Sequence, residues 1–213
     1  MNLPFPKELY PVKGKPVVSF LFEAMIRAEV RKFLVVIGEN KQQIMHYLGN
    51  GERFGVSVGY TYQENPLGLA NAVTQIKPFV SNEVLVLGLP DTIIEGQFSF
   101  KTVINACQAR KSDVVLGLFK VKHPEKFGVV EVADGSRKIL SIKDKPRSPV
   151  SKWVWGVAVF GESIFKVIDR IKPSQNELQL TDAFQMALDL GLDVSYVKFP
   201  RAVYTDIGGG EMD

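Results

Sequence analysis

Residues 84–121 read VLVLGLPDTIIEGQFSFKTVINACQARKSDVVLGLFKV, and they carry the clearest evidence for the fold class. Short apolar runs at 84–89 and 113–121 predict two strands, and the longer pattern at 98–110 predicts a helix between them. Strands that alternate with helices in this way form a mostly parallel sheet with helices on both faces. The stretch therefore predicts an α/β protein.

The same alternation continues toward the N-terminus. Further strands are expected at 32–38 and 56–63, and further helices at 16–29, 40–50 and 68–78. The runs at 32–38 and 84–89 are apolar without alternation, which predicts strands that are covered on both faces.

After residue 121 the rhythm changes. Residues 127–144 read as two strands joined by a turn at Asp134-Gly135, and residues 152–160 read as another strand. Helices at 162–172 and 181–191 and a strand at 193–199 complete the pattern. Because no repeat or linker-like composition interrupts it, residues 1–213 are expected to form a single domain whose sheet carries an antiparallel extension.

Composition narrows the functional classes. The 213 residues carry a net charge of +3 and no run of five or six basic residues, so a nucleic-acid partner is not indicated. The single cysteine, Cys107, rules out a disulfide within the chain and is expected to be a buried, inert thiol. No apolar stretch approaches the ~18 residues of a membrane span, and a signal-peptide core is absent. No membrane partner is expected, and a cytoplasmic location is the default.

Two aspartates follow predicted strands. Asp91 comes just after the strand at 84–89, and Asp206 ends the strand-like YTD before a glycine turn. Ligands of open α/β sheets gather at the carboxyl ends of strands, and magnesium prefers oxygen donors. Both aspartates are therefore candidate magnesium ligands. The alternative is a turn or helix-capping role for Asp91 and a turn role for Asp206, and spacing alone cannot prove that the two residues meet.

Other polar residues are candidates for substrate contacts. Gln63 carries a donor and an acceptor, which suits a nucleobase edge, and Gly68 permits close backbone approach at a strand-to-helix turn. Lys7 and Lys145 are compact cations that suit phosphates, and Asp144 suits a sugar hydroxyl or a cation. An ordinary helix-entry turn and solvated surface lysines are the alternatives.

Several short motifs follow one another along the chain, and their order is more specific than any one of them. In sequence the chain carries PKELYPVKGKPVV, YQENPLGLANAV, LVLGLPDTI, FGVVEV, SIKDKP, WGVAVF, NELQLTDA and YTDIGGGE. This order, over nearly the whole chain, resembles the sugar-1-phosphate nucleotidylyltransferases, in particular the hexose-1-phosphate thymidylyl- and uridylyltransferase type. The resemblance implies a Rossmann-like core with an inserted sugar-binding region. It also implies nucleotidyl transfer from dTTP or UTP to a hexose 1-phosphate, with Mg2+ and release of pyrophosphate.

The resemblance implies roles for residues at matching positions. On the nucleotide side, Lys7 would hold the triphosphate, Gln63 and Gly68 would read the base, and Asp91 and Asp206 would bind magnesium. The residues that would contact the sugar phosphate are Gly128, Asp144, Lys145 and Gly156. Lys7, Lys145 and Asp91 would carry the catalysis.

The chain also departs from the family pattern. It has no glycine-rich loop with an arginine before Lys7, and it carries Asp144 where Glu is usual, Gln179 where an acid is common and Pro90 where glycine is usual. A chain that is partial at both ends, with little activity and poor stability, is therefore expected. A non-catalytic relative that binds a nucleotide sugar remains an alternative. A glycosyltransferase is a weaker one, because those enzymes usually hold their metal with two nearby acids. The sugar, the base and homo-oligomerisation stay open.

Overall fold

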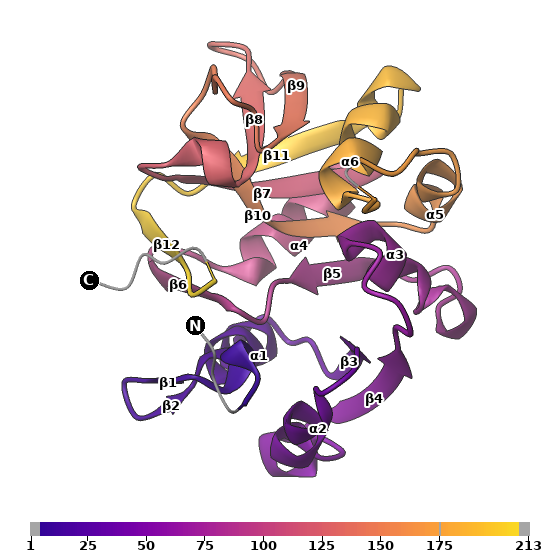
Figure 1. The fold of residues 1–213 in the computed structure, drawn as a ribbon. Helices are drawn as coiled ribbons and strands as arrows, with labels where there is room; N and C mark the ends of the chain where they lie inside the picture. The colour runs from indigo at the N-terminus through magenta and orange to yellow at the C-terminus, as the bar shows by residue number, and fades with distance from the viewer. Residues whose placement is uncertain (1–4, 175, 209–213) are drawn as a thin grey trace.

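The computed structural model describes residues 5–174 and 176–208 (Figure 1). Its α-helices are α1 (Val17–Arg27), α2 (Gln42–Leu48), α3 (Leu69–Thr74), α4 (Phe100–Arg110), α5 (Ser163–Ile168) and α6 (Leu180–Asp189). Its strands are β1 (Pro11–Val12), β2 (Lys15–Pro16), β3 (Lys32–Ile37), β4 (Ser57–Tyr62), β5 (Leu85–Gly88), β6 (Thr92–Gly96), β7 (Val114–Lys120), β8 (Gly128–Val132), β9 (Ile139–Asp144), β10 (Trp153–Phe160), β11 (Val194–Lys198) and β12 (Ala202–Asp206). A short 3-10 turn, η1 (Lys7–Leu9), opens the described chain.

The main sheet has six strands in the order β11-β7-β10-β8-β9, with β5 also paired to β10. One edge of β10 pairs with β7, and the other edge is shared by β8 at Val154 and by β5 from Val157 to Phe160. Both β5 and β7 run antiparallel to β10, and β11 runs parallel to β7, so β5, β7 and β11 share one direction. The α/β class is confirmed, and β8 with β9 forms the expected antiparallel extension.

Helices cover both faces of this sheet (Figure 1). One core contains Phe160, Leu180 and Phe184 and lies beneath α5 and α6, while the other contains Phe100 and Phe119 and lies beneath α4. Cys107 is buried in the second core, and burial raises the pKa of its thiol, as expected of an inert residue. None of the helices in the described part of the chain is long and apolar enough to cross a membrane.

The strands β3 and β4 form a separate parallel pair, and within the described residues each pairs only with the other. Figure 1 shows them beside α2, apart from the main sheet. The prediction that residues 32–38 are covered on both faces is wrong, because Lys32 and Leu34 are exposed on one face of β3. In β5 all four residues are only half-buried. Apolar runs therefore indicated the strands correctly but overstated their burial.

The sequence did not predict a strand at residues 92–96, where the structure has β6, and it did not predict that β6 pairs with β12. The two strands run antiparallel, with Asp206 opposite Thr92 and Ala202 opposite Gly96. Since β6 begins where the turn after β5 ends, this register brings the end of β12 back to the end of β5.

Candidate functional site

The β6–β12 pairing brings Asp91 and Asp206 together. Asp91 lies in the turn between β5 and β6, and its carbonyl accepts a hydrogen bond from the Ile207 amide at 3.0 Å. A Cβ atom at Gly208 would lie 3.2 Å from Asp206 Oδ1 and 3.8 Å from Asp91 Oδ2. The two carboxylates, 115 positions apart by their residue numbers, therefore approach one common point.

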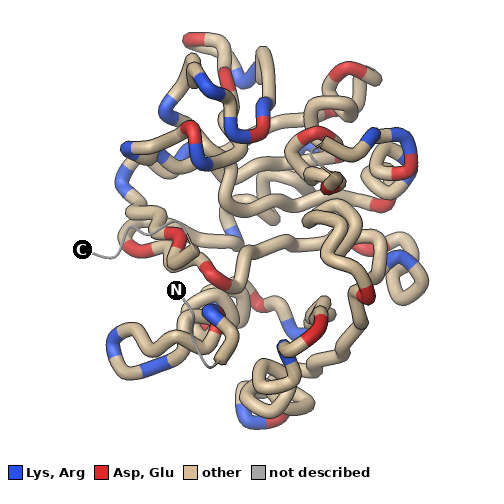
Figure 2. The backbone as a smooth tube through the Cα atoms, viewed as in Figure 1, with Lys and Arg blue, Asp and Glu red and all other residues tan. Residues whose placement is uncertain are grey.

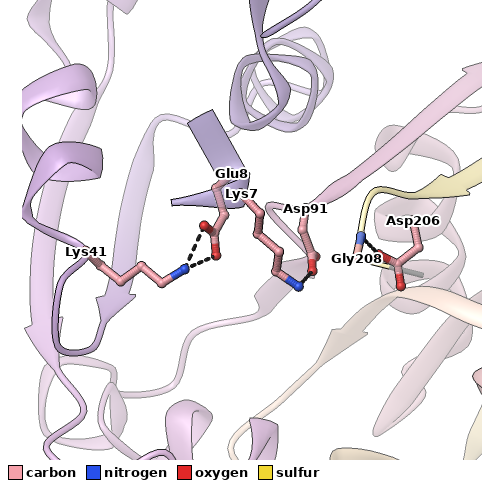
Figure 3. Close-up of polar contacts among 6 residues, drawn as sticks. All are labelled: Lys7, Glu8, Lys41, Asp91, Asp206 and Gly208. Carbon is pink, nitrogen blue, oxygen red and sulfur yellow. Dashed lines mark hydrogen bonds and ion pairs between the residues drawn. The ribbon is translucent and has the colours of Figure 1, made fainter. Parts of the chain in front are cut away.

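Lys7 is the third member of this group (Figure 3). Its Nζ lies 2.6 Å from Asp91 Oδ2 and would lie 2.8 Å from the same Cβ at Gly208. Burial alone would lower the pKa of Lys7, but the hydrogen bond to Asp91 and the charges of Asp91 and Asp206 outweigh it and raise this pKa. The site thus holds an ammonium ion at the point that the two carboxylates share.

The turn that carries Lys7 is held by a second ion pair. Glu8 is 8% exposed, and both its carboxylate oxygens accept hydrogen bonds from Lys41 Nζ, at 2.9 and 2.8 Å (Figure 3). Lys41 comes just before α2, so the contact joins η1 to the start of that helix. Sequence reasoning missed Glu8 and Lys41, because nothing in the sequence marks two residues from different elements as partners.

The geometry suits a cation. The Gly208 amide donates to Asp206 Oδ1 at 2.7 Å, and the missing side chain of Gly208 leaves room beside these oxygens for the Lys7 ammonium (Figure 3). Carboxylate oxygens are the donors that divalent magnesium prefers. Among the described residues there is no group of three or more His, Cys, Asp or Glu side chains placed to hold a metal. A cation held by Asp91 and Asp206 would therefore take further oxygens from water or phosphate.

Gly68 and Gln63 lie together at the start of α3. Gln63 Nε2 donates to Gly68 O at 3.2 Å and to Asn71 Oδ1 at 2.8 Å. Gly68 has φ +95°, and a Cβ there would lie 2.6 Å from Leu178 O. The close neighbour that excludes a side chain at Gly68 is therefore the segment around Leu178, whose carbonyl also accepts from the Ala70 amide.

Packing also explains two of the predicted sugar-side glycines. A Cβ at Gly128 would lie 2.2 Å from Trp155 Nε1, and a Cβ at Gly156 would lie 2.1 Å from Tyr204 Cε2. Gly156 falls at an irregularity in the β10–β7 register, between Trp155 and Val157. Trp155 is 6% exposed and packs edge-on against Phe184, so its role is in the core.

Asp144 ends a hydrogen-bonded chain of side chains. Trp155 Nε1 donates to Thr181 Oγ1 at 3.0 Å, and Thr181 Oγ1 donates to Asp144 Oδ1 at 3.2 Å. Burial and the charge of Asp144 raise the pKa of neighbouring Asp182. Lys145 follows β9 with φ 39°, is exposed, and donates its backbone amide to Phe127 O at 3.0 Å.

One residue connects the two halves of the candidate site. Tyr204 belongs to β12, two residues before Asp206, and its ring packs against Gly156 of β10. Gly156 neighbours Trp155, which leads through Thr181 to Asp144. Burial, together with the charges of Asp206 and Asp91, raises the pKa of Tyr204, so its hydroxyl stays neutral. The predicted nucleotide-side and sugar-side residues are thus linked through continuous contacts.

Comparison with known proteins shows the family to which the chain belongs. The profile of the nucleotidyl transferase family matches residues 3–211. Glucose-1-phosphate thymidylyltransferase from Streptomyces griseus is 34% identical over 190 residues, which are 88% of this chain and 53% of that protein. The enzyme of the same name from Neisseria meningitidis is 34% identical over 188 residues, 87% of this chain and 65% of that protein. The chain thus spans between half and two thirds of these relatives.

Solved structures show the same fold. The structure of a protein from Bacillus anthracis in complex with sucrose matches this chain with a TM-score of 0.86 and 27% sequence identity. The match covers 96% of this chain and 82% of that chain. A structure of UDP-glucose pyrophosphorylase complexed with UDP-glucose has a TM-score of 0.85 at 22% identity, covering 97% of this chain and 88% of that chain. At that identity the second likeness concerns the fold alone. The Rossmann-like α/β class is confirmed.

Proposed function

Because this chain belongs to the nucleotidyl transferase family, we propose that the protein transfers a nucleotidyl group from dTTP or UTP to a hexose 1-phosphate. An oxygen of the sugar phosphate forms a bond to the α-phosphorus, the bond between the α- and β-phosphates breaks, and pyrophosphate leaves. The observation that carries the proposal is the convergence of Lys7, Asp91 and Asp206 on one point beside Gly208.

A divalent cation, with Mg2+ as our candidate, would be held by Asp91 and Asp206. Their oxygens approach a common point beside Gly208, where a cationic group, the Lys7 ammonium, already lies. When bound, the ion would supply positive charge next to the phosphates of the triphosphate. Lys7 adds a second positive charge, since its raised pKa keeps the ammonium protonated at neutral pH.

The remaining work of this chain is positioning. The oxygen of a sugar phosphate is already a nucleophile and needs no strong base, so catalysis rests on holding two anions in line and stabilising charge. We assign Lys145 and Asp144 to the sugar phosphate, together with the glycines Gly128 and Gly156. Figure 2 shows Lys and Arg gathered in the loops near β8 and β9, interspersed with acids, which would favour approach of an anion.

On the nucleotide side, we assign Gln63 and Gly68 to the base. The support is their shared turn at the start of α3, where the side chain of Gln63 is held against the Gly68 carbonyl. The hydrogen-bonding capacity of Gln63 that this turn leaves unused is its side-chain oxygen.

The test is release of pyrophosphate from dTTP or UTP in the presence of glucose 1-phosphate and MgCl2. We expect the variants Asp91→Asn and Asp206→Asn to lower turnover on the order of 100-fold, because each removes a negative charge that holds the cation. Glu29→Gln is the matched control, since Glu29 pairs with exposed Lys101 away from the site. Unchanged turnover in both aspartate variants would remove the proposed roles. Binding of a nucleotide sugar without any pyrophosphate release would favour a non-catalytic binder instead.

A further inference from the structure

Both hydrogens on the side-chain nitrogen of Gln63 are already bound within the protein. Nε2 donates to the Gly68 carbonyl at 3.2 Å and to Asn71 Oδ1 at 2.8 Å. A carboxamide nitrogen has two hydrogens, and its oxygen accepts only. A ligand that reaches the Gln63 side chain therefore meets an acceptor, Oε1.

Hydrogen-bond chemistry also determines which of the two side-chain atoms of Gln63, Oε1 or Nε2, faces the Gly68 carbonyl. Exchanging the oxygen and nitrogen of Gln63 would point Oε1 at the Gly68 carbonyl, and a carbonyl has no hydrogen to donate. Asn71 could turn its own amide to follow such an exchange, but the backbone carbonyl of Gly68 cannot. The observed orientation is the one in which both contacts of Gln63 are hydrogen bonds.

Helix propensity does not favour asparagine at position 71. Asn71 lies inside α3 between Ala70 and Ala72, and asparagine is a poorer helix former than alanine. The helix contacts at this position use its backbone, because the Asn71 carbonyl accepts from Thr74 Oγ1 at 2.7 Å and from Gln75 Nε2 at 3.2 Å. The partner that the structure gives to its side chain is Gln63.

We propose that Asn71 is a positioning residue for base choice: it holds the Gln63 amide so that only Oε1 faces the base. The site would then favour bases that offer a ring N–H at this edge, as uracil and thymine do. It would disfavour cytosine, whose corresponding ring nitrogen is an acceptor. This inference rests on the proposed function, because it takes Gln63 to be the residue that meets the base.

The experiment measures the dissociation constants of UTP and CTP by calorimetry with the 213-residue chain, in MgCl2. We expect the wild type to prefer UTP. In Asn71→Ala one N–H of Gln63 becomes available to the ligand, so the UTP-over-CTP preference should fall by about tenfold. Asn71→Asp keeps the acceptor oxygen and should restore most of the preference, whatever its added charge does to the affinity for both nucleotides.

Gln75→Ala is the matched control. It removes a hydrogen bond to the Asn71 carbonyl in the same helix without touching Gln63, so the preference should stay at the wild-type value. If Asn71→Ala melts early, Asn71→Gln, which moves the amide outward by one methylene, gives the same readout and should also lose preference.

The possible outcomes distinguish failure of the positioning role of Asn71 from failure of the proposed function. A wild type that prefers UTP and an Asn71→Ala variant that keeps the full preference would overturn the positioning role and leave the proposed function standing. A wild type that binds neither nucleotide would overturn the proposed function and, with it, this inference. Loss of preference in Asn71→Ala with recovery in Asn71→Asp supports it, since a purely structural role would change both affinities equally.

Discussion

Lys7 lies where Asp91 and Asp206 would receive a divalent cation. Its Nζ contacts Asp91 at 2.6 Å, and both groups are partly exposed, at 44% and 21% for the two side chains. An ion pair of this exposure is screened by solvent and contributes modestly to stability. If Asp91 and Asp206 bind a divalent ion as proposed, the ammonium would compete with it for the same oxygens until phosphates arrive to hold both.

This competition predicts the behaviour of Lys7→Met. Removing the ammonium should strengthen binding of Mn2+ in the absence of nucleotide by up to about fivefold, which corresponds to the loss of a partly exposed ion pair. Titration of Mn2+ monitored by electron paramagnetic resonance measures this directly. Lys101→Met, which breaks the exposed pair with Glu29, is the control and should leave the affinity unchanged. Weaker Mn2+ binding in Lys7→Met would show that Lys7 does not compete with the ion.

At the scale of elements, the strand β12 connects the parts of the site. Asp206 lies at its end, and Tyr204 is two residues earlier, 7% exposed, with its ring against Gly156. The register of β12 against β6 places Asp206 opposite Thr92 and thus beside Asp91. Contact between β12 and β10 therefore matters for the position of the carboxylate pair as well as for packing.

We expect Gly156→Ala to be destabilising. Its Cβ would lie 2.1 Å from Tyr204 Cε2, and the ring is held in a packed core, so overpacking should cost about 1–3 kcal/mol. For a chain of this size each kcal/mol lowers the melting temperature by about 2–4 °C. Gly161→Ala, just past the end of the same strand, is the control because nothing lies within 4 Å of a Cβ there. Equal melting temperatures for the two variants would mean that Tyr204 yields without cost.

In the molecule as a whole, the main sheet and the β3–β4 pair differ in the contacts that attach them to the rest of the protein. The main sheet joins six strands by backbone hydrogen bonds, whereas β3 and β4 pair only with each other within the described chain. Side chains such as Phe33, which stacks on Phe22 of α1 at 4.5 Å between ring centroids, connect this pair to the rest. Among the described residues, the β3–β4 pair thus has no backbone pairing with the main sheet and is attached to the rest through side-chain contacts such as this one.

Hydrogen exchange should reveal this difference. Amides of β3 and β4 should exchange at least about tenfold faster than those of β7 and β10, because local opening of the pair breaks no backbone pairing with the main sheet. Exchange followed by mass spectrometry on peptides from both regions measures the ratio. Comparable protection in the two regions would indicate that the strands open only when the whole chain unfolds.

Local patterns in the sequence are enough to predict the α/β class and most of its elements. Local hydrophobic patterns carry that information, so the predictions at 113–121 and 152–160 agree with β7 and β10 within a residue or so. The same patterns could not report burial, because exposure of Leu34 on β3 depends on what packs against that strand. The motifs named Lys7, Gln63, Asp91 and Asp206 as candidates, and their roles stay predictions.

Which of these residues meet depends on how the chain folds in three dimensions. Asp91 and Asp206 converge because β6 pairs with β12, and that pairing is fixed by contacts between distant segments that no local pattern encodes. The partners of Glu8 and Gln63 are likewise set by placement: Lys41 comes from the start of α2, and Asn71 from α3. A sequence specifies the periodicity of each element through the residues next to one another, whereas a site is made of side chains that meet only after the chain has folded.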